Sequence, residues 1–186
     1  MIPIESFRML RKADFVAIAL LVAVWAALTA LLNALLSASA VFPLIFVTAA
    51  FSAFAALLVR RIGAVILFMF AASSVAYLFG LLAPFGVNPV PVLAAAGFVF
   101  ELVYVIIKAE FRSVPINLLG AAGLSGASIP WAMLLLSNTE AAGLLSAAAN
   151  FSLSAFFIGV AGAVASFAAW YEVKSTRAVI RYEYAV

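Results

Sequence analysis

Residues 41–83 read VFPLIFVTAAFSAFAALLVRRIGAVILFMFAASSVAYLFGLLA, two apolar runs separated by the arginine pair Arg60 and Arg61. A helix rises about 1.5 Å per residue, so about 20 apolar residues cross the roughly 30 Å hydrocarbon core of a bilayer. Each run is close to that length. The stretch therefore predicts two transmembrane helices joined by a short basic turn.

The same pattern runs through the whole chain of 186 residues, of which 69% are hydrophobic and 9% are charged. The mean hydropathy is +1.30, and a soluble domain of this size cannot hide that much apolar surface. We therefore expect an all-α integral membrane protein that forms a single membrane domain over residues 1–186. The six predicted transmembrane helices cover residues 14–37, 41–59, 62–83, 90–107, 115–136 and 143–170.

The residue types that the sequence lacks limit its chemistry. It has no cysteine and no histidine, which excludes disulfides and removes the commonest general base and transition-metal ligand. Residues 123–126, GLSG, resemble a serine nucleophile motif, but Ser125 has no base to activate it. We expect no enzyme activity, no cofactor and no metal site. Because the sequence also lacks a glycine-rich phosphate loop, ATP hydrolysis would need other subunits.

Lysine and arginine mark one side of the predicted bundle. All ten precede the first helix, follow the sixth, or lie between helices two and three or four and five. The positive-inside rule makes this side cytoplasmic, so we expect both termini in the cytoplasm. The net charge of +3 is then a topology signal, and nucleic acid is not an expected partner. The ten residues are Arg8, Arg11, Lys12, Arg60, Arg61, Lys108, Arg112, Lys174, Arg177 and Arg181.

Polar side chains recur at every fourth position of the predicted first helix, at Trp25, Thr29 and Asn33. This spacing places them on one helix face, and polar groups in membrane helices usually face the inside of a bundle. We expect Asn33 within about 10 Å of the extracellular boundary and Thr29 about 12 to 17 Å from it. Together with Asn150 in the last helix, these residues predict a polar cup that opens outward.

Three aromatic residues in other helices complete the predicted substrate site: Tyr77, Tyr104 and Trp131. The rings of Trp25 and Trp131 can stack on a flat heterocycle, while the amides of Asn33 and Asn150 can bind its polar edge. Each residue also has a purely structural interpretation. Aromatic side chains anchor helices at membrane interfaces, and side-chain amides can hold two helices together.

Glu101 is the predicted centre of the site, because it is the one acid in the apolar run 94–107. A charged carboxylate in mid-membrane costs on the order of 3 kcal/mol, and no lysine or arginine lies within a predicted span to pair with it. We expect Glu101 near the floor of the cup, where a ligand amine or ring cation binds it. The alternative is a protonated acid held by hydrogen bonds.

Alanine forms a second face on the first helix. Ala19, Ala23 and Ala27 recur every four residues, and this face is centred about 120° from the Trp25 face. Small residues let another helix approach closely. The face therefore predicts either internal packing or a contact with another subunit.

Six spans, cytoplasmic termini, an AxxxA first helix and an outward polar cup together resemble the S components of energy-coupling factor (ECF) vitamin transporters. Two stretches resemble the branch associated with thiamine precursors, the YkoE-type proteins. They are RRIGA at residues 60–64 and GFVFELVY at residues 97–104.

The resemblance implies a substrate-capture subunit in the cell membrane of a prokaryote. Its small-molecule substrate would be a vitamin or a precursor, such as a hydroxymethylpyrimidine or a thiazole. The implied partners are a transmembrane coupling subunit, two cytoplasmic ATPase subunits and the lipid bilayer. The residues carried over from the family are Ala19, Ala23 and Ala27, as the face that contacts the coupling subunit.

Two other functions fit the same residues. A stand-alone carrier would use Glu101 as a proton site and would transport its substrate without ATPase subunits. A ligand-free assembly protein would use its polar faces only to hold helices together.

Overall fold

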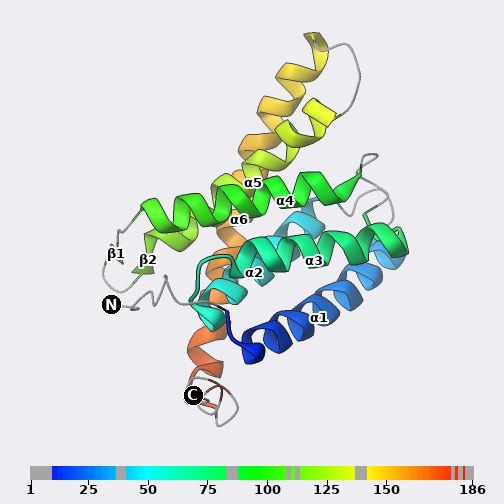
Figure 1. The fold of residues 1–186 in the computed structure, drawn as a ribbon. Coiled ribbons are helices and arrows are strands. Elements are labelled where there is room, and N and C mark those ends of the chain that lie inside the picture. The colour runs from blue at the N-terminus through cyan, green and yellow to red at the C-terminus, as the bar shows by residue number, and fades with distance from the viewer. Residues whose placement is uncertain are drawn as a thin grey trace.

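The computed structural model describes residues 10–36, 41–82, 88–107, 110–111, 114–136, 142–176, 179 and 182. These residues form six helices and one short β ladder (Figure 1). The ladder pairs β1 (Glu110–Phe111) with β2 (Val114–Pro115) in antiparallel register. The helices are α1 (Lys12–Leu36), α2 (Val41–Val59), α3 (Ala64–Phe79), α4 (Pro89–Ile106), α5 (Ile116–Leu136) and α6 (Ala142–Val173).

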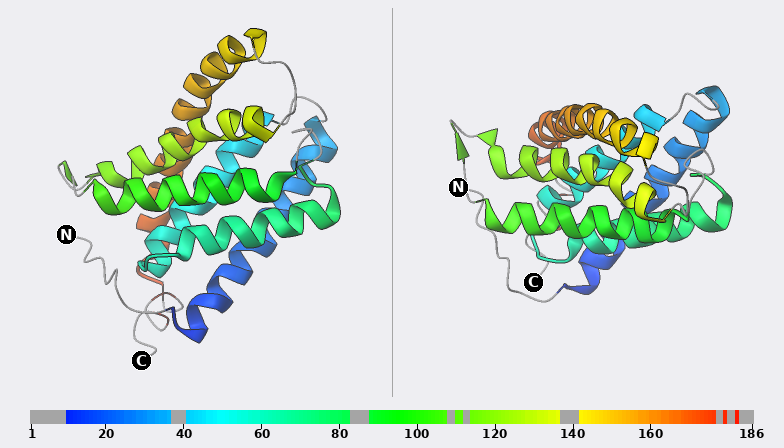
Figure 2. Two further views of the ribbon diagram at one scale, coloured as in Figure 1. Left: turned by 45° about the horizontal axis from the view of Figure 1, so that its top comes forward. Right: turned by 90° about the horizontal axis from the view of Figure 1, so that it is seen from above.

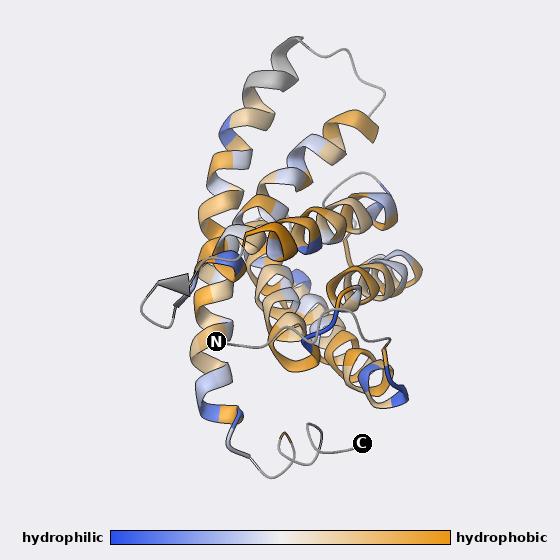
Figure 3. Ribbon diagram, turned by 60° about the vertical axis from the view of Figure 1, so that its left-hand side comes forward, coloured by the Kyte–Doolittle hydropathy of each residue, from blue (hydrophilic) through white to orange (hydrophobic). Residues whose placement is uncertain are grey.

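Within the described part of the chain, five helices are long and apolar enough to cross a membrane: α1, α2, α4, α5 and α6. The remaining helix, α3, is also apolar but has 16 residues. Apolar residues make up most of the helical ribbon, and hydrophilic residues occur at helix ends and at single positions within the helices (Figure 3). The predicted helical class is confirmed, and the five apolar helices agree with the predicted multi-pass membrane protein.

Helix α3 is shorter than the predicted span at residues 62–83, because a glycine in the left-handed region lies at each end. Gly63 precedes the helix with φ of 88° and Gly80 follows it with φ of 65°. Glycine adopts this conformation without steric cost. The Gly80 amide donates to the carbonyl groups of Ala76 and Tyr77, which ends the helix after Phe79.

Helix α2 lies at the centre of the bundle and packs against α1, α3, α5 and α6. The outer helices form a chain of neighbours in which α1 contacts α3, α3 contacts α4, α4 contacts α5, and α5 contacts α6 (Figure 2). Since α1 makes its main contacts with α2 and α3 alone, one of its faces is left without a helix from this chain.

A buried ion cluster ties three segments together at one end of the bundle. Asp14, in the first turn of α1, is fully buried and lies 3.2 Å from Arg61 Nε in the α2–α3 turn. The Tyr182 hydroxyl, beyond α6, donates to the same carboxylate. The start of α1, the α2–α3 turn and the chain after α6 therefore meet at this basic end. The other predicted basic positions Arg8, Lys108, Arg112, Arg177 and Arg181 lie outside the described residues.

Candidate functional site

Glu101 binds the start of helix α3. Its Oε1 accepts a hydrogen bond of 2.8 Å from the backbone N–H of Val65, and the side chain is 6% exposed. The first amides of a helix have no intrahelical partner and carry the positive end of its dipole. Glu101 thus caps α3, with a backbone N–H at the start of that helix as its hydrogen-bond donor.

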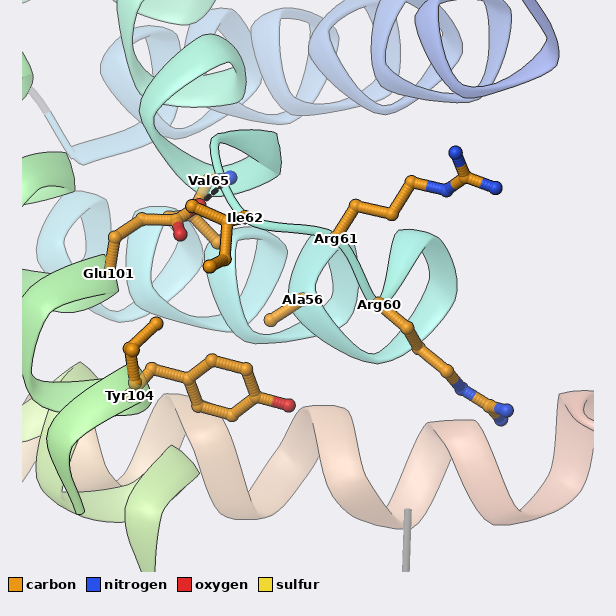
Figure 4. A pocket seen from close by; sticks show the side chains of 8 residues that line it. Ala56, Arg60, Arg61, Ile62, Val65, Glu101 and Tyr104 are labelled. Atoms are coloured by element: carbon orange, nitrogen blue, oxygen red, sulfur yellow. Dashed lines mark hydrogen bonds between the residues drawn. The ribbon is translucent and has the colours of Figure 1, made fainter. Parts of the chain in front are cut away.

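The cavity beside Glu101 has a volume of about 10 Å³. It is lined in part by Ala56, Val65 and Tyr104, and the side chains of Arg60 and Arg61 extend away from the carboxylate (Figure 4). This volume is close to the minimum for a single water molecule. A heterocycle does not fit beside Glu101 in this conformation.

Asn33, near the end of α1, lies far from this carboxylate. Asn33 donates through Nδ2 to the carbonyl of Leu81, just beyond the far end of α3. Glu101 caps the opposite end of the same helix. The 16 positions between Val65 and Leu81 correspond to roughly 24 Å along the helix axis. The structure therefore separates Glu101 from Asn33 instead of placing both around one cup.

Trp25 is an internal residue of the bundle. Its ring is 0% exposed, and its Nε1–H donates to Thr48 Oγ1 on α2 at 3.1 Å. The ring also meets Phe68 of α3 edge-on, with centroids 6.5 Å apart. These contacts join α1 to α2 and α3, so Trp25 has a structural role at one end of the polar face of α1.

Two polar atoms above Trp25 are buried without a hydrogen-bond partner among the described residues. They are Thr29 Oγ1 and Asn33 Oδ1, one helical turn apart on the inward face of α1. An unsatisfied buried polar atom costs about 1–3 kcal/mol. The pair therefore has hydrogen-bonding capacity that the described residues leave unused.

The remaining predicted substrate residues do not join this pair. Tyr77 is 60% exposed and Trp131 is 41% exposed, on α3 and α5. Asn150 is exposed on α6. Tyr104 is buried near Glu101, with its ring 6.1 Å from that of Phe100. In this conformation the predicted residues form two separate groups and three outward-facing positions.

The alanine face of α1 is exposed, as a contact surface for another chain requires. Ala19, Ala23 and Ala27 are all exposed. Ala19 and Ala23 line an apolar groove of about 500 Å³ between α1 and α3, whose other wall includes Leu67 and Ala71. Among the described helices, α1 makes its main contacts with α2 and α3.

Sequence reasoning missed Asp14 and Tyr182. The Arg11 backbone N–H also donates to Asp14 Oδ2 at 2.7 Å, so the carboxylate is held by a helix-start amide, an arginine and a tyrosine. Burial, and then the hydrogen bond and negative charge of Asp14, raise the pKa of Tyr182 above its ordinary value. The available signal was an acid in the first turn of an apolar helix, close to a basic residue.

Comparisons with known proteins assign this chain to no class, so its class is argued from its fold and site. The chain matches no protein-family model, and neither the curated proteins nor the solved structures give a match.

Proposed function

We propose that this chain is a substrate-capture subunit of an ECF-type importer for a vitamin or vitamin precursor, in the cell membrane of a prokaryote. In this proposal all six helices lie within the membrane and both termini are cytoplasmic. The bundle binds its ligand from outside, and a coupling subunit with two ATPase subunits supplies the energy for uptake.

The observation that carries the proposal is the division of α1 into two faces. One face is buried and bears Thr29 and Asn33, whose unpaired atoms can receive a ligand. The other bears the exposed residues Ala19, Ala23 and Ala27, which suit close packing against a membrane helix of another subunit. A single helix thus offers one surface to a ligand and another to a partner.

The chemistry of Thr29 and Asn33 favours a small polar heterocycle. Asn33 Oδ1 accepts a hydrogen bond, while the Thr29 hydroxyl can both donate and accept. An aminopyrimidine presents an N–H donor beside a ring-nitrogen acceptor, which suits this pair. A hydroxymethylpyrimidine therefore agrees with the chemistry better than a purely apolar ligand does.

A thermal-shift screen of the purified protein tests the proposal. The panel contains thiamine, hydroxymethylpyrimidine, thiazole precursors and other water-soluble vitamins. A ligand at about 100 times its Kd stabilises a protein by about 2.7 kcal/mol, which is about 5 °C or more at this size. We expect one chemical class to give such a shift. No shift across the panel, together with no ATPase in the purified complex, would overturn the proposal.

Uptake by reconstituted vesicles separates this function from a stand-alone carrier. A capture subunit by itself binds the screened ligand but does not concentrate it, even under a proton gradient. Accumulation by the isolated chain would assign it to the carrier class instead.

A further inference from the structure

A proline divides helix α5 into two parts with different surroundings. Pro130 lies inside the helix, and every residue of α5 that is buried lies at this position or before it. None of the residues 131–136 is buried, and Leu135 is 83% exposed. The first part of α5 therefore belongs to the packed bundle, while the last part, residues 131–136, has no buried residue to hold it in place.

The first part of α5 is held between α4 and α6. Ser125 Oγ donates to the Ala96 carbonyl of α4 at 2.8 Å. On the side of α6, a Cβ at Gly126 would lie 2.6 Å from the carbonyl oxygen of Ala155, which is too close for any side chain. The backbones of α5 and α6 therefore touch just before the proline, and this contact is a fixed point for the last part of α5.

Pro130 also leaves one carbonyl group of α5 without its usual donor. Proline has no backbone N–H, so the carbonyl of Gly126, four positions earlier, receives no hydrogen bond from residue 130. Helical carbonyl groups point toward the C-terminal end of their helix, so this one points from the contact with Ala155 toward the last part of α5. Sharp bends in helices occur mainly at such positions.

A hydroxyl group on α6 lies at the same level. The contacts of Gly126 with Ala155 and of Gly159 with Ala122 show that α5 and α6 run antiparallel. Ser152 shares the α6 face of Ala155 and Gly159 and lies about 4.5 Å from Ala155 along the helix, in the direction of the last part of α5. Its side chain is 8% exposed, and its Oγ has no hydrogen-bond partner among the described residues.

We propose that Pro130 is a hinge about which the last part of α5 moves between two positions, and that a hydrogen bond from Ser152 to the Gly126 carbonyl holds the second position. The structure shows the first position, in which the hydroxyl is unpaired. Serine side chains of neighbouring helices can satisfy the carbonyl that a proline frees within a membrane, and pairing a buried hydroxyl is favourable. The inference does not rest on substrate capture, since Thr29 and Asn33 take no part in it.

Distances between spin labels in the purified full chain test the proposal. The sequence has no cysteine, so only introduced cysteines carry a label. Leu135→Cys with Leu78→Cys, both strongly exposed, reports the separation of the last part of α5 from α3. We expect double electron–electron resonance to give two distance populations for this pair. Leu20→Cys with Leu78→Cys, on α1 and α3, is the control pair and should give one. A single narrow population for the first pair would overturn the proposal.

A substitution of the proline tests the hinge. Pro130→Ala supplies the missing N–H to the Gly126 carbonyl and continues the helix, so we expect the two populations of the Leu135 pair to become one. Pro89→Ala is the matched control, because Pro89 begins α4, where a missing N–H costs least. It should keep both populations. Both populations in wild-type proportions in Pro130→Ala would contradict the hinge.

A substitution of the serine tests the hydrogen bond. Ser152→Ala removes the donor but leaves the hinge, so we expect the second population to fall at least fivefold. Ser154→Ala is the matched control, since Ser154 is exposed on α6 and donates to the Asn150 carbonyl of its own helix. It should leave the populations unchanged. Wild-type populations in Ser152→Ala would overturn the assigned contact, because the hydroxyl would then bond to another group, such as a carbonyl of α6.

Discussion

Two buried threonines, Thr29 and Thr48, differ in whether their hydroxyl groups have a hydrogen-bond partner. Thr48 Oγ1 accepts from Trp25, and the two side chains join α1 to α2. Thr29 is fully buried one turn above Trp25, and its hydroxyl has no partner among the described residues. The same side chain therefore serves as a structural contact on α2 and as a free hydrogen-bonding group on α1.

Matched valine substitutions distinguish these two roles. Thr29→Val removes an unsatisfied hydroxyl, so we expect the free energy of unfolding without ligand to stay constant or to rise by up to about 1 kcal/mol. Thr48→Val leaves Trp25 Nε1–H buried and unpaired, which should cost about 1–3 kcal/mol. Denaturant unfolding in detergent measures both. A larger loss in Thr29→Val than in Thr48→Val would contradict the assigned roles.

Glu101 should act through its acceptor oxygen, because it caps α3 at Val65. Glu101→Ala removes the cap, and we expect a loss of about 0.5–2 kcal/mol in the free energy of unfolding. Glu101→Gln keeps an oxygen that accepts from the same amide, so it should lose less than half as much. The two variants are compared by denaturant unfolding. Equal losses would show that the negative charge matters more than the hydrogen bond.

Tyr182 gives the basic end a predictable response to pH. Its pKa is raised in the folded state, so its contribution to stability is complete below the ordinary pKa of about 10 and is lost as the pH rises through the raised value. Tyr182→Phe removes the hydrogen bond to Asp14 and should cost about 1 kcal/mol at pH 8.

Melting temperatures of the wild type and of Tyr182→Phe between pH 7 and pH 11 measure this contribution. The difference should stay constant up to about pH 9 and should shrink above about pH 10. Tyr171→Phe, at an exposed ring on α6, is the control substitution. A difference that grows above pH 10 would contradict the assignment.

At the scale of single elements, α1 and α3 differ in length and in how their ends and faces are bounded. Helix α1 has 25 residues, and its buried face includes Ile18, Val22 and Trp25, while its alanine face is exposed. Helix α3 has 16 residues and is limited by Gly63 and Gly80. A long helix with one uncovered face is suited to contact another protein, while the short helix fixes the distance between the Glu101 cap and the Asn33 contact.

In the proposed function the alanine face of α1 contacts a coupling subunit, so it should control assembly with that subunit and its ATPases. Ala23→Phe places a large side chain in the middle of that face, so we expect at least a tenfold drop in ATPase that co-purifies from the native membrane. Ala161→Phe, on the exposed surface of α6, should leave co-purification unchanged. Wild-type amounts of ATPase with Ala23→Phe would exclude this face as the contact.

At the scale of the whole molecule, hydropathy predicts the helices well and the site less well. The predicted range 41–59 coincides with α2, and proline punctuation marks the start of α4, where Asn88 caps the helix beside Pro89. These features are local, so they can be read from neighbouring residues. The length of α3 could not be predicted in this way, because neighbouring residues alone do not show that Gly63 and Gly80 adopt the left-handed conformation.

The partner of Glu101 illustrates why the site was harder to predict. The sequence predicts either a ligand cation beside Glu101 or a protonated acid held by hydrogen bonds, and the structure gives a backbone amide 36 positions earlier in the chain as its donor. Backbone amides are present at almost every residue, and only the point at which a helix begins leaves them unpaired. The α1 stripe of Trp25, Thr29 and Asn33 was visible because helical periodicity alone places it on one face.

The central claim is that the unpaired polar atoms of α1, and not Glu101, receive the ligand. The most direct test is the Kd of the ligand found by the thermal-shift screen, measured by calorimetry for the wild type, Thr29→Val and Glu101→Gln. We predict at least a tenfold weaker Kd for Thr29→Val, which corresponds to about 1.4 kcal/mol, and a change of less than about twofold for Glu101→Gln. A wild-type Kd for Thr29→Val together with a tenfold loss for Glu101→Gln would contradict the account.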